Sequence, residues 1–106
     1  MDLPQRFTLG QIETIMEEAA IYMCACPAQV CREILNLRKL YQYQLDCVAN
    51  AGDPHVHTLI AVQTTVAHRA LEECLADIID HEGWDPETLA MPVHLRTLRD
   101  DLIRAE

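Results

Sequence analysis

The chain has 106 residues, of which 50% are hydrophobic, and a formal net charge of −9. This length suits one domain with a single modest core, and we expect residues 1–106 to form it. With only three glycines and 5% aromatic residues, the composition argues against a β-sandwich or barrel and favours an all-α fold. The acidic balance leaves little basic surface for a phosphate backbone, so nucleic acid is not an expected partner.

Residues 1–7 form a short tail without the apolar segment of a signal peptide. No apolar run approaches the roughly 20 residues that a membrane span requires, so no membrane association is expected. The five cysteines are an odd number, and a chain of this size does not need disulfides to fold. We therefore expect a cytoplasmic protein whose thiols stay reduced.

A first helix is predicted over about residues 9–24. Thr8 and Gln11 have the spacing of a capping box, and Phe7 and Ile12 occupy the positions of a hydrophobic staple. Apolar residues then recur at helical spacing on one face. They are Leu9, Ile12, Met16, Ala19, Ala20 and Met23.

A second helix is predicted over about residues 27–50. Pro27 disfavours helical geometry at the residue before it and is well placed as the first residue of a new helix. Gly52 supplies a stop after Asn50. The broad apolar face of this helix suggests two neighbours, and it comprises Val30, Cys31, Ile34, Leu35, Leu37, Leu40, Tyr41, Leu45 and Val48.

A third helix, roughly 40 Å long at 1.5 Å per residue, is predicted over about residues 54–82. Asp53 is its expected N-cap, and Gly83 its expected end. Its expected buried face comprises Val56, Leu59, Ile60, Gln63, Ala67, Ala70, Leu71, Cys74, Leu75 and Ile78. His68 then falls on the polar side, one turn before Glu72, where we expect a surface pair.

Two shorter helices are predicted over about residues 86–91 and 93–104, separated by Pro92. Short connections make the three long helices antiparallel neighbours, and the C-terminal helix would close a four-helix-like bundle. The small residues Ala67 and Ala70 suit close packing within one chain or between two. We therefore expect a homodimer or another protein partner.

Three of the five cysteines lie at the junction of the first two helices, as Cys24, Cys26 and Cys31. An antiparallel third helix would bring Cys74 or His81 to the same end of the bundle. Thiolates with a fourth ligand can hold zinc or an iron–sulfur cluster. The dipole at the start of a helix would favour the thiolate of Cys31.

The spacing of these cysteines matches neither CxxC nor a ferredoxin-type run. Two further interpretations therefore stay open: the cysteines are small buried hydrophobes, or Cys24 and Cys26 form a redox disulfide. His81-Glu82 resembles half of an HExxH motif, but Asp85 stands where the second histidine is required.

No nucleophile–base pair, P-loop or GxSxG motif is present in the sequence. The sequence therefore does not indicate an enzyme. The function that it favours is a non-catalytic interaction or regulatory module that self-associates. The alternatives are a thiol-ligated metal or iron–sulfur module at the cysteine junction and a small redox protein.

Overall fold

The computed structural model describes residues 3–19, 26–50 and 53–92. These residues contain three helices, α1 (Leu9–Ala19), α2 (Cys26–Asn50) and α3 (Pro54–Glu82), and no strand. The predicted all-α class is therefore confirmed. The predicted helix 93–104 and the last residues of the predicted helix 9–24 lie outside the described residues.

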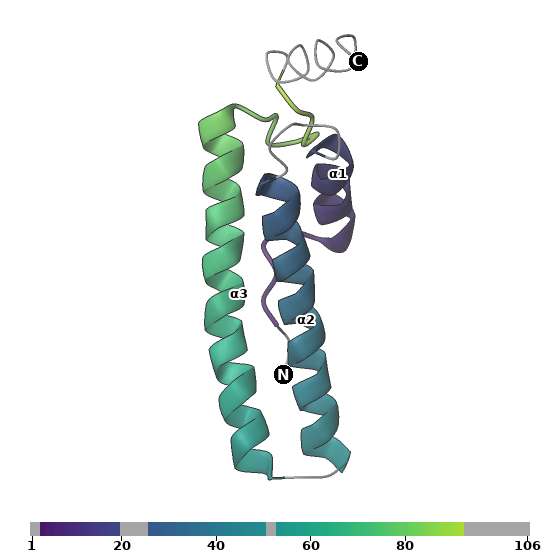
Figure 1. Ribbon diagram of the computed structural model, residues 1–106, viewed down its shortest axis with the longest axis vertical. Helices are drawn as coiled ribbons and strands as arrows, with labels where there is room; N and C mark the ends of the chain where they lie inside the picture. The colour runs from purple at the N-terminus through teal and green to yellow at the C-terminus, as the bar shows by residue number, and fades with distance from the viewer. Residues whose placement is uncertain (1–2, 20–25, 51–52, 93–106) are drawn as a thin grey trace.

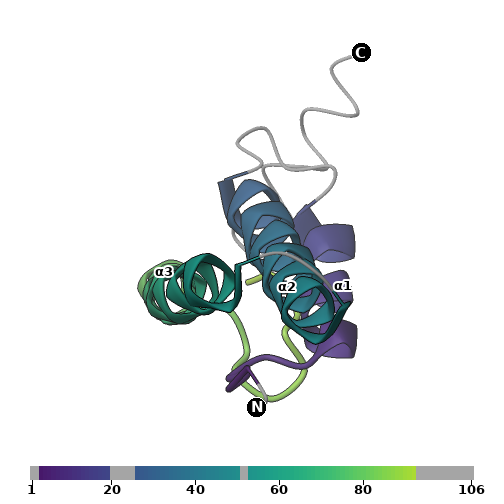
Figure 2. The same cartoon turned by 90° about the horizontal axis from the view of Figure 1, so that it is seen from below.

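The two long helices α2 and α3 form an antiparallel hairpin, and α1 packs against α2 (Figure 1). Viewed along the hairpin, α2 lies in the middle, with α3 on one side and α1 on the other (Figure 2). Because α1 is short, it accompanies only the N-terminal part of α2. The far part of the hairpin is therefore a pair of helices without a third layer among the described helices.

The predicted helix starts are confirmed by their hydrogen bonds. The Thr8 amide donates to Gln11 Oε1 at 2.9 Å, and the Gln11 amide donates to Thr8 Oγ1 at 3.1 Å. Asp53 is the N-cap of α3, since its Oδ1 accepts from the His55 amide at 2.9 Å. These bonds satisfy amides that have no partner within the helix.

The end of α3 is also as predicted. Gly83 has a φ of 81°, and its amide donates to the carbonyls of Ile79 and Asp80. The Trp84 amide donates to the Ile79 carbonyl at 3.0 Å, and the Trp84 side chain is buried. A left-handed glycine followed by an apolar residue that folds back is a common way to end a helix.

Where a helix was expected over residues 86–91, the structure instead forms a turn. Asp85 Oδ1 accepts from the amides of Glu87 and Thr88, and the Leu89 amide donates to the Asp85 carbonyl at 2.8 Å. Leu89 has a φ of 59°, which is outside the right-handed helical region. The chain therefore turns back and places Leu89 and Met91 in the core.

The main core lies where α1, the first half of α2 and the last half of α3 meet. It is closed at one end by the turn that follows α3. Its buried members are Phe7, Ile12, Ile15, Ala19, Ala28, Cys31, Ile34, Leu75, Ile79, Trp84, Leu89 and Met91.

The buried face of α3 differs from the predicted one. Its buried residues are Ala61, Thr64, His68, Glu72, Leu75 and Ile79. Only Leu75 belongs to the predicted face, whereas Val56, Leu59, Gln63, Ala67, Ala70 and Cys74 are exposed. The prediction was wrong because α3 carries apolar residues on opposite sides, and the side with the large apolar residues is not the one that faces α2.

Candidate functional site

A buried polar cluster joins the two long helices. Arg38 Nη2 of α2 lies 3.3 Å from Glu72 Oε2 of α3, and Arg38 Nε donates to His68 Nε2 at 3.0 Å. His68 and Glu72 are 1% and 3% exposed. The prediction that His68 and Glu72 form a pair on the surface was therefore wrong, because both side chains are buried and face α2.

The same cluster holds the N-terminal segment against the hairpin. Glu72 Oε2 accepts from the amides of Arg6 at 2.8 Å and Phe7 at 3.0 Å, and Arg38 Nη2 donates to the Phe7 carbonyl at 2.6 Å. A buried carboxylate needs partners of this kind to offset its desolvation. The charges of Arg38 and Glu72 balance, and together they fix where the segment before α1 lies.

The hydrogen bond from Arg38 determines the state of His68. Since Arg38 has no acceptor, His68 Nε2 accepts, and its proton is on Nδ1, 3.5 Å from Glu72 Oε1. Burial lowers the pKa of His68, the nearby Glu72 carboxylate opposes this shift, and the Arg38 charge adds to it. A neutral, fully buried imidazole with both nitrogens facing partners suits a structural role.

The spacing of α3 contained a signal for this cluster. Residues 61, 64, 68, 72, 75 and 79 follow one another in steps of three or four, which place side chains on one helix face. A search for the most hydrophobic face of the helix misses this face, because a threonine, a histidine and a glutamate occupy three of its positions.

Among the described cysteines of the predicted metal site, Cys31 lies apart from Cys26 and Cys74. Cys31 is fully buried in the main core, and burial raises its pKa to about 11. This direction is opposite to the lowering expected from the helix dipole, and it favours the thiol over the thiolate that metals bind. Cys24 lies outside the described residues.

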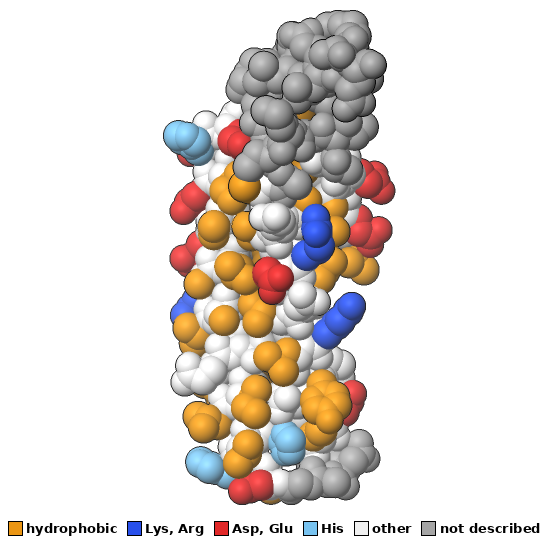
Figure 3. All heavy atoms as spheres, in the orientation of Figure 1, with side chains coloured by type: hydrophobic (Ala, Val, Ile, Leu, Met, Phe, Trp, Pro, Cys, Tyr) orange, Lys and Arg blue, Asp and Glu red, His pale blue; other side chains and the backbone are white. Residues whose placement is uncertain are grey.

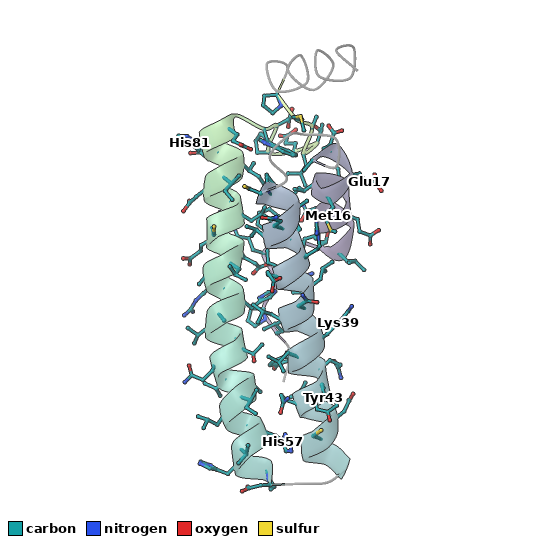
Figure 4. The ribbon with its side chains drawn as sticks, viewed as in Figure 1. Met16, Glu17, Lys39, Tyr43, His57 and His81 are labelled. Carbon is teal, nitrogen blue, oxygen red and sulfur yellow. The ribbon has the colours of Figure 1, made fainter. Side chains whose placement is uncertain are left out.

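Cys26, Cys74 and His81 line one open groove of about 710 Å³. Cys31 is not among the lining residues, and His81 lies at the end of α3, pointing away from α2 (Figure 4). Within residues 3–19, 26–50 and 53–92, no three His, Cys, Asp or Glu residues are placed to hold a metal ion. The metal site therefore stays a prediction from the sequence, without support from the described part of the chain.

An apolar stripe runs along the solvent side of α3. We call it the outer stripe. All of its members are exposed: Val56, Leu59, Val62, Gln63, Val66, Ala67, Ala70 and Cys74. The three valines and Leu59 are 45% to 53% exposed. A row of half-exposed large apolar side chains on one helix is a feature of interaction surfaces.

The far part of the hairpin buries two polar residues beside Tyr41 and Ala61, while several of its large apolar residues are exposed. Gln44 and Thr64 are buried between the helices, and Gln44 Oε1 lies 2.7 Å from His57 Nδ1. His57 lies between the two helices (Figure 4). Leu40 and Tyr43 of α2 are exposed together with the large residues of the outer stripe. Hydrophobic side chains accordingly spread over the visible face of both long helices (Figure 3).

Comparison with known proteins assigns no function to this arrangement. No family model matches the chain, and neither the curated proteins nor the solved structures include a significant match. Among the described helices, none combines the length and the apolar character needed to cross a membrane. The interpretation of the site therefore rests on its own geometry.

Proposed function

We propose that this protein is a non-catalytic interaction module that self-associates through the outer stripe of α3. The observation that carries the proposal is that α3 is apolar on the side facing away from α2. A helix that is apolar on opposite sides is normally covered on both. In this chain, α2 and the N-terminal segment cover only one side of α3 among the described residues.

The polar interior of the hairpin supports a role in binding. Gln44 and Thr64 take positions between the helices that large apolar residues could fill, while Leu59, Val62 and Val66 remain outside. Fully burying a valine or leucine side chain contributes about 1.5–3 kcal/mol. Completing the burial of these side chains on a partner would therefore supply a driving force for association.

The buried cluster does not suggest catalysis. Arg38, His68 and Glu72 bind one another and the backbone of residues 6 and 7. These hydrogen bonds hold the N-terminal segment in place, so each of the three residues has a structural role. The cytoplasmic location and the lack of a nucleic-acid partner stay predictions from composition.

Sedimentation velocity at micromolar concentration tests the proposal. We expect a mass near twice the chain mass of 12.1 kDa. Val66→Glu should weaken the dimer at least about tenfold, because an unpaired buried carboxylate costs more than 1.4 kcal/mol. Asn36→Glu is the matched control, since it adds the same charge at an exposed position of α2 that is not part of the outer stripe.

A monomer at all concentrations up to 100-fold above this range would overturn the proposal. The same experiment separates it from the metal hypothesis. A self-associating module should keep its mass and melting temperature when Cys24→Ser and Cys26→Ser are combined. A metal module should lose a bound metal, detected by elemental analysis, and melt at a clearly lower temperature.

A further inference from the structure

The two halves of the outer stripe differ in side-chain size. The first half, from Val56 to Val66, carries large apolar residues that are about half exposed. The second half carries Ala67, Ala70 and Cys74, and there the surface is hollowed into the groove of about 710 Å³ that Ala70, Cys74 and Ile78 line. One end of the stripe therefore protrudes and the other recedes.

The two halves also differ in charge. Residues 54–68 contain no Lys, Arg, Asp or Glu. The remainder of α3 carries the exposed acidic residues Glu73, Asp77 and Asp80 and one exposed basic residue, Arg69. Two copies aligned in parallel would place these carboxylates against each other, and like charges in close contact oppose association.

We propose that a second copy of this chain covers the outer stripe, with the two α3 helices antiparallel about a two-fold axis near Val66 and Ala67. This inference rests on the proposed function and names the geometry of its partner. A two-fold interface uses the same patch on both subunits, so the patch must be complementary to itself. The outer stripe meets this requirement when its protruding half lies on the receding half of the second copy.

The axis defines which residues meet. Leu59 of one copy lies level with Cys74 of the other, and Gln63 lies level with Ala70. At both ends, a larger side chain thus faces a smaller one. Glu73 of each copy then lies level with Ile60 in the uncharged half of the other copy, and Asp77 lies level with Val56 in the first turn of its α3. Asp80 lies level with the N-cap residue Asp53. The partial positive charge of a helix N-terminus favours nearby carboxylates.

Cysteine cross-linking tests this arrangement, in a background in which Cys24, Cys26 and Cys47 are replaced by serine. Leu59→Cys with native Cys74 should give a disulfide-linked dimer upon mild oxidation. The matched control, Leu59→Cys combined with Cys74→Ser, should stay uncross-linked. In the antiparallel geometry, the two copies of residue 59 are about 22 Å apart, at 1.5 Å of rise per residue.

The outcomes separate this inference from the proposed function. A dimer in which the control also cross-links, or in which Cys74 links to its own counterpart, would show parallel helices and overturn the inference. If sedimentation shows a dimer but Leu59→Cys forms no cross-link, the interface lies elsewhere, and this result would also overturn the inference. A monomer that is folded by circular dichroism would overturn the proposed function itself.

Discussion

Arg38 Nε of α2 donates a hydrogen bond of 3.0 Å to His68 Nε2 of α3. This contact fixes both the tautomer and the charge of a histidine that is 1% exposed. Glu72, one turn further along α3, balances the charge of Arg38 and accepts from two amides of the N-terminal segment. The position of residues 6 and 7 thus depends on a histidine that stays neutral and on the carboxylate of Glu72 that accepts their amides.

The stability of the fold should depend on the ionisation of His68. Because its pKa is lowered in the folded chain, the unfolded chain takes up the proton at higher pH than the folded chain. The free energy of unfolding should therefore fall as the pH drops below 6.5, the ordinary value, by at most about 1.4 kcal/mol per pH unit from this group. Urea unfolding at a series of pH values between 7.5 and 5 measures this decline in the free energy of unfolding. His68→Gln should show a shallower decline, and an unchanged decline would contradict the assignment.

Glu72→Gln should destabilise the protein by about 3 kcal/mol, because it leaves the Arg38 charge without a counter-charge in a largely buried site. The variant should also release the N-terminal segment, so trypsin should cleave faster after Arg6. Thermal unfolding and the rate of this cleavage measure the two effects. Glu33→Gln, at an exposed position of α2, should change stability by less than about 0.5 kcal/mol. Equal effects of the two substitutions would contradict the role of Glu72.

Replacing each of two glycines by alanine should change the stability of the fold in opposite directions. Gly83 has a φ of 81°, which disfavours any residue with a Cβ, although nothing lies within 4 Å of that atom. Gly83→Ala should cost about 1 kcal/mol of folding free energy. Gly10 lies in α1, where an added Cβ meets only Thr8 Oγ1 at 3.9 Å, so Gly10→Ala should stabilise by up to about 1 kcal/mol. Chemical denaturation of both variants measures the difference, and the same sign for both would contradict it.

The thiols should differ sharply in reactivity. Cys31 is fully buried and burial raises its pKa to about 11, so both access and thiolate population oppose its alkylation. Cys26 and Cys74 are exposed. Mass spectrometry after brief treatment with iodoacetamide at pH 7.5 should find Cys26 and Cys74 modified first, and Cys31 only after denaturation. Early modification of Cys31 in the folded protein would contradict its place in the core.

The sequence by itself determined the start of α1 and the bounds of α2 and α3. Thr8 with Gln11, Asp53 with Pro54, and Gly83 with Trp84 are local signals, because the atoms that satisfy the helix ends lie within a few residues of them. The predicted bounds of α3, and those of α2 to within one residue, therefore agree with the structure. After Asp85, the same kind of signal was misleading, since a turn rather than a helix places Leu89 in the core.

Only the tertiary structure decided which side of α3 is inside. The side with Val56, Leu59 and Val66 is the more apolar, yet the side with His68 and Glu72 faces α2. Burying that side becomes favourable through Arg38, 30 residues earlier, and through the amides of residues 6 and 7, more than 60 residues away. Polar residues can be buried between two helices when residues distant in the sequence form hydrogen bonds with them. The periodicity of a helix contains no information about such partners.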